Sequence, residues 1–185
     1  YYAYGTVLAQ YSTNNAGVSV NALSSEGSKA NIEALQNNEA ELAFCQSDVT
    51  TYAYEGTSLF EGAPYQDFSV VASLYGEQVP IVTCDPNIKA VADLKGKTVS
   101  IGAANSGVYF NAVDILGAYD MTEEDINAVY QNFADSADSL KNDKIDAAFI
   151  TAGAPTTAIS DLTTSKQAYL VSMDAEHIAK LQETS

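Results

Sequence analysis

One stretch of the chain decides its fold: Leu94-Lys95-Gly96-Lys97-Thr98-Val99-Ser100-Ile101-Gly102-Ala103-Ala104-Asn105-Ser106-Gly107-Val108-Tyr109-Phe110. Val99 and Ile101 alternate as in a strand, 102–107 is a run of small and turn-forming residues, and an apolar helical pattern resumes over 109–116. The first turn of a helix leaves backbone N–H groups without partners, so Ser106 and the amides after it suit a carboxylate or similar anion. The alternative is that a polar residue of this turn only caps its own helix.

The same order of strand, small-residue turn and helix occurs at three other places. The turns are 25–28, 46–48 and 151–155, and a helical pattern follows each of them. Strands that alternate with helices indicate an α/β fold with mainly parallel sheets, whose ligands bind beyond the carboxyl ends of the strands. Four such turns would supply hydroxyls and amides for hydrogen bonds to a ligand, with tyrosine rings as walls.

Local patterns also predict the neighbouring elements. Alternating or β-rich runs predict strands over 18–22, 68–74 and 79–84. Ser47 or Asp48 is the predicted N-cap of the helix that follows it. Pro155 fits the first position of another helix, and Asp174 is the predicted cap of the last helix. Val129 and Tyr130 suggest a short strand.

Composition excludes several classes of partner. The 185 residues carry a net charge of −16, and all 8 basic residues are lysines. Nucleic acids and anionic membrane surfaces both need clustered Lys and Arg, so neither is an expected partner. No run approaches the roughly 20 apolar residues of a membrane span, and no signal-peptide pattern is present. The sequence starts within a helical pattern at Tyr1 and stops soon after the helical pattern of Ile178 and Leu181, so we expect it to be cut at both ends.

We find no catalytic or metal-binding constellation in the sequence. The single histidine, His177, falls in a polar helix, where a solvated position is expected. The run 123–125 fits a solvated first helical turn better than a metal site. No nucleophile elbow, Walker pattern or dinucleotide fingerprint occurs. Cys45 and Cys84 lack metal-ligand spacing and are expected to be buried free thiols, although a disulfide between them stays open. The sequence therefore predicts no enzyme activity, no cofactor and no metal.

Several motifs resemble one known family, the TAXI-type solute receptors of TRAP transporters, which share the type II periplasmic binding protein fold. The resemblance covers nearly the whole chain. The matching motifs are Tyr1-Tyr2, Glu26-Gly27-Ser28, Leu42-Ala43-Phe44-Cys45-Gln46-Ser47-Asp48-Val49, Ala72-Ser73-Leu74-Tyr75, Asp93-Leu94-Lys95-Gly96-Lys97, Asn105-Ser106-Gly107, Ile145-Asp146-Ala147-Ala148-Phe149 and Ala152-Gly153-Ala154-Pro155-Thr156. The pair at 105–107 and 152–156 is the most diagnostic.

The resemblance implies two lobes, 1–78 and 79–185, each with a mainly parallel sheet flanked by helices and a ligand cleft between them. The lobes would close about a hinge near 75–80. The N- and C-terminal parts of the first lobe would be missing from this chain. The implied protein is a monomeric receptor in the periplasm, or at the cell surface through an upstream anchor. It would capture an amino acid or a dicarboxylate such as glutamate and deliver it to TRAP permease subunits, without inserting into the membrane itself.

The ligand-binding residues that this resemblance and the turns predict are Tyr1, Tyr2, Gly27, Ser28, Gln46, Ser47, Tyr75, Asn105, Ser106, Gly107, Val108, Gly153 and Ala154. Val108 departs from the threonine usual in the family. The absence of arginine excludes, within this chain, a bidentate clamp for carboxylates. Lys95 and Lys97 precede their strand and should lie at its far end. The helix start at Ser106 therefore remains the best anion site.

Two other functions share the fold. A phosphoribosyltransferase-like enzyme would need phosphate-binding and acid–base residues, which the sequence does not show. A ligand-sensing effector domain of a LysR-type regulator would follow a DNA-binding helix-turn-helix, which this chain neither includes nor excludes.

Overall fold

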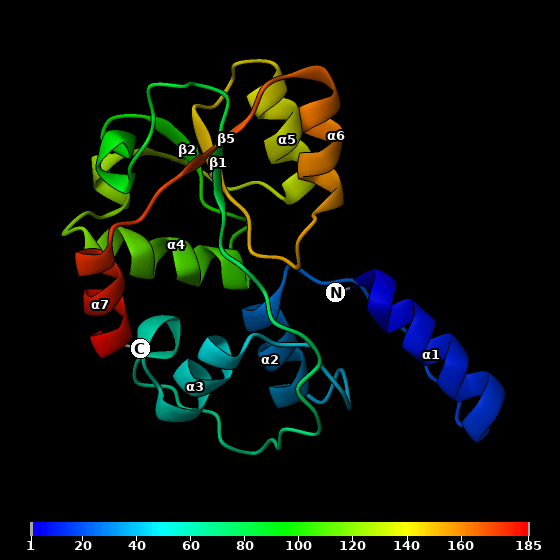
Figure 1. The fold of residues 1–185 in the computed structure, drawn as a ribbon. Coiled ribbons are helices and arrows are strands. Elements are labelled where there is room, and N and C mark those ends of the chain that lie inside the picture. The colour runs from blue at the N-terminus through cyan, green and yellow to red at the C-terminus, as the bar shows by residue number, and fades with distance from the viewer. Residues whose placement is uncertain (1, 185) are drawn as a thin grey trace. The chain divides into compact units, whose positions relative to one another are not determined.

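The computed structural model describes residues 2–184, apart from the side chain of the last of these. The chain divides into two compact units, Tyr1–Phe68 (unit 1) and Ser69–Ser185 (unit 2). The α-helices of the described residues are α1 Tyr2–Ala16, α2 Ser28–Gln36, α3 Ser47–Glu55, α4 Gly107–Ala118, α5 Phe133–Lys141, α6 Thr157–Ser165 and α7 Ala175–Thr184 (Figure 1). Short 3₁₀ helices are η1 Ser58–Phe60, η2 Val91–Leu94 and η3 Glu123–Asp125. The strands are β1 Ile81–Thr83, β2 Thr98–Ser100, β3 Asn127–Val129, β4 Ala147–Phe149 and β5 Tyr169–Val171.

The only regular elements among the described residues of unit 1 are helices, and the strand predicted over 18–22 is wrong. That segment, like the apolar run 41–46, is irregular chain outside any strand. Alternating apolar residues favour an extended backbone, but a strand also needs a neighbour that pairs with its N–H and C=O groups. No described part of unit 1 supplies such a neighbour.

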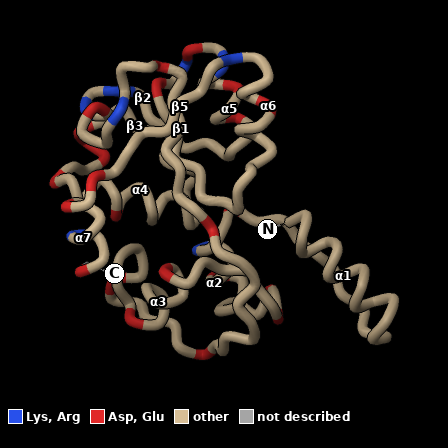
Figure 2. The backbone as a smooth tube through the Cα atoms, viewed as in Figure 1, with Lys and Arg blue, Asp and Glu red and all other residues tan. Residues whose placement is uncertain are grey.

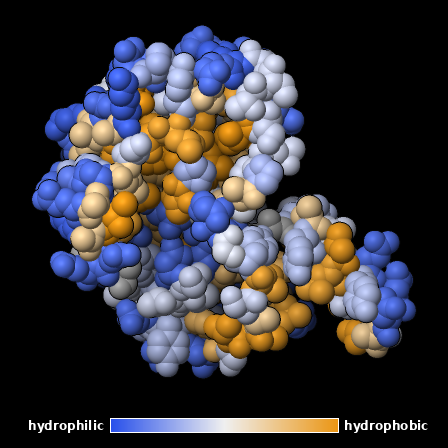
Figure 3. Space-filling view, viewed as in Figure 1, coloured by the Kyte–Doolittle hydropathy of each residue, from blue (hydrophilic) through white to orange (hydrophobic). Residues whose placement is uncertain are grey.

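The core of unit 1 lies between α2, α3 and η1. Its buried side chains are Ile32, Val49, Ala53 and Phe60. Gly56 ends α3 with φ 71°, the left-handed conformation that glycine adopts without strain. Large side chains along α1 are exposed, among them Val7, Leu8 and Tyr11, and orange surface is visible along this helix in Figure 3.

Unit 2 contains one mixed sheet in the order β3-β2-β4-β1-β5. Strands β3, β2 and β4 are parallel, whereas β1 is antiparallel to both β4 and β5. The strand predicted over 79–84 is present as β1, whereas no strand forms over 68–74. The sheet is less uniformly parallel than expected because β1 reaches β2 through irregular chain and η2, without an α-helical crossover.

Helices cover both faces of this sheet. Alternate strand residues pack to opposite sides: Ile81 and Phe149 join a cluster with α4, while Val82 and Ile150 join a cluster with α5 and α6. Figure 1 shows α4 on one side of the strands and α5 with α6 on the other. Burial on both faces explains the continuous apolar runs of β1 and β4.

Candidate functional site

Three parallel strands of unit 2 end at the same edge of the sheet. Their order, β3-β2-β4, places the turns 130–132, 101–106 and 150–156 side by side at the carboxyl ends. In open α/β sheets this edge is where ligands bind. It also carries the predicted site residues 105–108 and 153–154.

The turn after β2 is shaped by one close approach. Gly102 has φ 85°, and a Cβ atom there would lie 2.6 Å from Val108 Cβ and 2.9 Å from Ser106 Oγ. Only glycine allows the turn to pass this near the start of α4. Asn105 follows in the left-handed region, with φ 67°.

Ser106 is the N-cap of α4. Its Oγ accepts a hydrogen bond from the Tyr109 backbone N–H at 3.2 Å, and only 8% of the residue is exposed. The capping interpretation of this serine is therefore confirmed, and such a cap contributes about 0.5–2 kcal/mol of stability. The hydroxyl proton of Ser106 has no acceptor among the described residues, so it remains available to a ligand.

Gly107 and Val108 form the first turn of α4, and both are buried. Their backbone N–H groups precede the first intrahelical hydrogen bonds and carry the positive end of the helix dipole. Val108 packs into the apolar core on the α4 side of the sheet. It contributes an amide at this position and no side-chain hydrogen bond.

The turn after β4 is fixed to α4 and to the chain before β1. Thr151 Oγ1 donates a hydrogen bond to Asn111 Oδ1 at 2.9 Å. Gln78 forms a backbone bridge with Ala152, and its side-chain Oε1 accepts a hydrogen bond from Ala154 N–H at 3.1 Å. The start of α4 and the 150–156 turn are thus joined within one hydrogen-bonded region.

The prediction that Pro155 begins a helix is wrong. Helix α6 begins at Thr157, with Thr156 as its N-cap. The Thr156 hydroxyl donates to Gly153 O at 3.2 Å, which closes a turn between β4 and the helix. Gly153 and Ala154 are exposed in this turn.

Gln131, which was not among the predicted site residues, lies at the same edge. Its side-chain Oε1 is buried and has no hydrogen-bond partner among the described residues. Gln131 is the second residue after the end of β3 at Val129. Its position after the strand suggested by Val129 and Tyr130 was the sequence signal that could have identified it as a site residue. A buried acceptor without a donor is costly, which makes this oxygen a candidate contact for a ligand N–H or O–H group.

Two tyrosines beside this edge share one carboxylate. The hydroxyls of Tyr109 and Tyr130 each donate to Glu123 at 2.5 Å, and their rings lie 6.1 Å apart. Burial and the adjacent Glu123 raise the pKa of Tyr109 to about 12. Both hydroxyls therefore stay protonated at neutral pH and hold the Tyr109 and Tyr130 rings in place.

The lysines of unit 2 gather at the opposite edge. Lys97, Lys144 and Lys166 each precede a strand, and Figure 2 shows most lysines of this unit at one end. Lys95 pairs with Asp125 at 2.9 Å. The prediction that Lys95 and Lys97 lie at the far end of their strand is confirmed.

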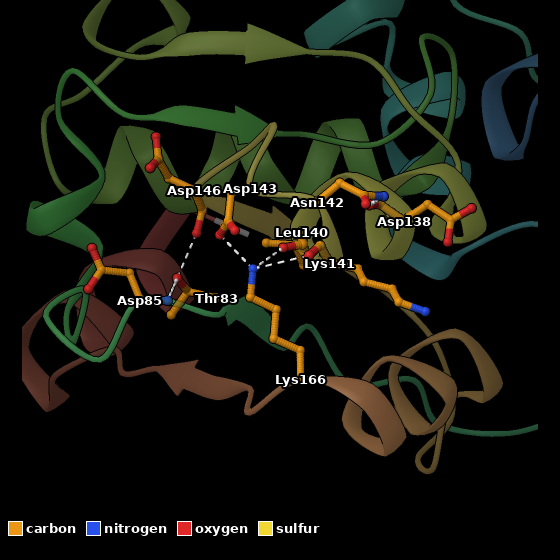
Figure 4. Close-up of polar contacts among 9 residues, drawn as sticks. All are labelled: Thr83, Asp85, Asp138, Leu140, Lys141, Asn142, Asp143, Asp146 and Lys166. Carbon is orange, nitrogen blue, oxygen red and sulfur yellow. Dashed lines mark hydrogen bonds and ion pairs between the residues drawn. The ribbon is translucent and has the colours of Figure 1, made fainter.

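Lys166 is held at the end of α5. Figure 4 shows its Nζ donating to Leu140 O at 2.9 Å, to Lys141 O at 3.2 Å and to the Asp143 carboxylate at 2.5 Å. A cation at this point satisfies carbonyls that the helix leaves unpaired. The ammonium group of Lys166 therefore binds the end of α5 and is not available to a ligand.

The predicted site residues of unit 1 also gather in one place. Gly27 is the N-cap of α2, and Ser28 follows as its fully buried first residue. Ser28 Oγ accepts from the Gln46 backbone N–H at 3.2 Å, which ties the start of α2 to the start of α3. Gln46 is the N-cap of α3, so the predicted caps Ser47 and Asp48 are wrong; Ser47 is the exposed first helical residue.

The remaining predicted residues are Tyr1, Tyr2 and Tyr75. Tyr1 lies outside the described residues, and Tyr2 is exposed at the start of α1. Tyr75 is exposed in extended chain of unit 2. The ligand roles of all these residues stay predictions.

His177 is more enclosed than expected. Its ring stacks on Tyr119 with a centroid distance of 3.7 Å, and its Nδ1 lies 2.7 Å from Asp174 Oδ1. Asp174 also accepts from the His177 backbone N–H, as predicted for the cap of the last helix. The histidine thus fastens α7 to the end of α4 instead of facing solvent.

Other chemistry is sparse in the described part of the chain. Cys45 and Cys84 are half-buried and free, and burial raises the pKa of Cys45 to about 12. Within residues 2–184, no group of His, Cys, Asp and Glu is placed to hold a metal ion. None of the described helices is long and apolar enough to cross a membrane.

Comparison with solved structures places the fold among binding proteins. The alkanesulfonate-binding protein SsuA from Xanthomonas axonopodis pv. citri, bound to MOPS, matches with a TM-score of 0.58 and 20% identity, over 91% of this chain and 56% of that one. An ancestral arginine-binding protein bound to arginine matches with a TM-score of 0.60 and 18% identity, over 98% of this chain and 81% of that one. A substrate-binding protein of an amino acid ABC transporter matches with a TM-score of 0.58 and 18% identity, over 93% of this chain and 67% of that one.

These matches confirm the predicted α/β fold of the type II periplasmic binding protein kind. The chain spans little more than half, 56%, of the Xanthomonas protein. A family model described as NMT1-like matches residues 1–185. The chain therefore belongs to the NMT1-like family.

Proposed function

We propose that this chain is part of an extracytoplasmic solute receptor that binds a small anionic solute. The observation that carries the proposal is the start of α4, where Ser106 caps the helix beside the buried Gly107 at the carboxyl edge of the sheet. Backbone N–H groups and the helix dipole favour an anion at such a position. The anion would be a carboxylate or sulfonate group of the solute.

The charge distribution supports recognition by neutral donors. The chain has no arginine, and the turns 101–106, 130–132 and 150–156 contain no lysine. Amides and hydroxyls must therefore supply the contacts at this edge. A hydrogen bond to a charged group contributes about 1.5–3 kcal/mol, so three bonds at the upper end of this range would supply about the 8 kcal/mol that micromolar affinity requires.

The relatives support a receptor role. The similar solved structures are binding proteins for an alkanesulfonate, for arginine and for a substrate of an amino acid transporter. A receptor of this kind works outside the cytoplasm and delivers its solute to membrane permease subunits. The motifs at 105–107 and 152–156 favour a TRAP-type permease and the TAXI group of receptors. L-Glutamate and dicarboxylates are the leading solutes.

The same arrangement argues against catalysis. His177 is stacked on Tyr119 and bonded to Asp174 at the end of α4, remote in sequence from all three turns. General acid–base chemistry needs a titrating group within hydrogen-bond reach of the substrate. We therefore propose capture and release without turnover.

A thermal-unfolding screen tests this proposal. The probes are the sodium salts of L-glutamate, succinate and ethanesulfonate, with L-arginine hydrochloride and sodium chloride as controls at matched ionic strength. A ligand that binds only the folded state at 100 times its Kd stabilises it by about 2.7 kcal/mol. We expect at least one anion to raise Tm above both controls. An equal effect of all five salts would contradict the proposal.

A further inference from the structure

Gln78 lies at the last rung of the ladder between β1 and β4. Ile81 pairs with Phe149, and the same antiparallel register continues to an isolated bridge between Gln78 and Ala152. Gln78 N–H donates to Ala152 O at 3.0 Å, and Ala152 N–H donates to Gln78 O at 3.1 Å. These two residues thus form a complete hydrogen-bonded pair.

The side chain of Gln78 takes the place of the next backbone acceptor in this ladder. Hydrogen-bonded pairs recur every second residue in an antiparallel ladder, so Gly76 O would be the next acceptor for Ala154 N–H. Instead, Ala154 N–H donates to Oε1 of Gln78 at 3.1 Å. The chain before Gln78 has left the sheet, since Gly76 and the residues of 69–75 are exposed and outside any strand.

We propose that Gln78 is a positioning residue for the 152–156 turn. Its side-chain carbonyl takes the place of the Gly76 carbonyl, so the turn keeps its shape although segment 69–76 forms no strand. The functional part of this inference rests on the proposed role of Gly153 and Ala154 in solute binding. Segment 69–76 joins unit 1 to the sheet, and movement of that segment would leave the turn in place.

The hydrogen bond to Gln78 changes the expected role of Ala154, one of the predicted site residues. The amide of Ala154 is committed to Gln78 and is not a donor to the solute. Ala154 therefore contributes the shape of the turn. Gly153, which is exposed beside it, is the residue of this pair that remains for direct contact.

Amide hydrogen exchange of Ala154, measured by ¹⁵N NMR on the whole chain, tests the positioning role without any ligand. Gln78→Met keeps the length of the side chain but removes the carbonyl, whereas Gln78→Glu keeps an acceptor oxygen. We expect Ala154 to exchange about fivefold faster in Gln78→Met and at nearly the original rate in Gln78→Glu. Ala152 N–H, which is bonded to the Gln78 backbone, should be unchanged in both variants.

Two results would overturn the positioning role. One is an unchanged Ala154 rate in Gln78→Met. The other is equal acceleration of Ala152 and Ala154, which would mean that the whole rung frays. A binding arm uses L-glutamate, succinate and ethanesulfonate, and we expect Gln78→Met to bind the anion more weakly than the unsubstituted chain. If the unsubstituted chain binds none of the three while the exchange result holds, the proposed function fails and the positioning role stands.

Discussion

The hydroxyl of Thr151 donates to the side-chain oxygen of Asn111 at 2.9 Å, which joins the carboxyl end of β4 to the first half of α4. Thr151 is only 5% exposed, so this bond lies in a region that water hardly reaches. It connects two of the turns that we propose to bind the solute. This pair of side chains therefore adds a direct link between turns that the pairing of β2 with β4 already places side by side.

Thr151→Val tests this connection, because valine keeps the shape of threonine but cannot donate. We expect the free energy of unfolding to fall by about 0.5–1.5 kcal/mol, since the oxygen of the half-buried Asn111 loses the Thr151 donor. Thr151→Ser keeps the hydroxyl and is the matched control. Urea unfolding followed by circular dichroism measures both variants. A valine variant at least as stable as the serine variant would show that the bond contributes nothing.

Gln131→Met should stabilise the free protein. The variant removes a buried oxygen that has no partner among the described residues and keeps an unbranched side chain of similar length. An unsatisfied buried polar group costs about 1–3 kcal/mol, so a gain of about 1 kcal/mol in the unfolding free energy is expected. A loss of stability in urea unfolding would contradict this prediction. Weaker solute binding by the more stable variant would assign Gln131 to the site.

The contribution of Asp174 to the stability of the protein should change with pH only below about pH 3.8. Hydrogen bonds from the His177 backbone and side chain lower the pKa of Asp174 from 3.8 to about 2. A carboxyl with a lowered folded-state pKa stabilises the protein above its unfolded pKa and loses this contribution as pH falls through the folded value. The stability lost in Asp174→Asn should therefore be constant near neutral pH and shrink between pH 3.8 and about 2.

The measurement is a pH series of unfolding free energies for the original protein and Asp174→Asn. A difference that stays constant down to pH of about 2 would rule out the carboxylate as its source.

His177→Ala should leave solute affinity unchanged, because this histidine contacts α4 at its far end. A tenfold loss of affinity without unfolding would place His177 at the site.

Gly107→Pro tests which group of the α4 start holds the anion. Gly107 is the first helical residue, a position at which proline is favourable, and Ser106 before it is already extended, with φ −85° and ψ 156°. The variant should therefore keep α4 while it removes one amide. We expect solute affinity measured by calorimetry to fall by about tenfold or more.

Gly107→Ala is the control, because it adds a side chain but keeps the N–H group. If both variants lose affinity equally, bulk at this buried position is the cause and the amide is not the donor. Circular dichroism spectra that match the original protein establish that the helix is intact.

The sequence predicted those elements whose signals are local. The alternating Val99 and Ile101, the capping serine at 106 and the apolar helical pattern over 109–116 predicted β2 and α4 to within about two residues at each end. Asp174 was recognised as a cap because its hydrogen bond reaches only three residues along the chain. Local patterns were sufficient wherever the stabilising partner was near in sequence.

The features that escaped prediction depend on distant partners. Segments 18–22 and 68–74 have strand-like composition, but no described strand pairs with them, so they remain extended chain. The bond between Ala154 and Gln78 joins residues 76 positions apart, and that between Thr151 and Asn111 spans 40. No local pattern marks such contacts, so the positions of the site turns had to come from the structure.

The most direct test of the central claim is an NMR titration of the ¹⁵N-labelled chain with L-glutamate, succinate and ethanesulfonate. We predict that the anion that binds best shifts the amide resonances of Gly107 and Val108 more than those of the lysine-bearing edge around Lys97 and Lys144. L-Arginine at the same ionic strength should not shift the amide resonances of Gly107 and Val108. Saturable binding of an anion that leaves the Gly107 and Val108 amides unshifted, or no binding of any of the three, would contradict the claim that α4 binds an anionic solute at its start.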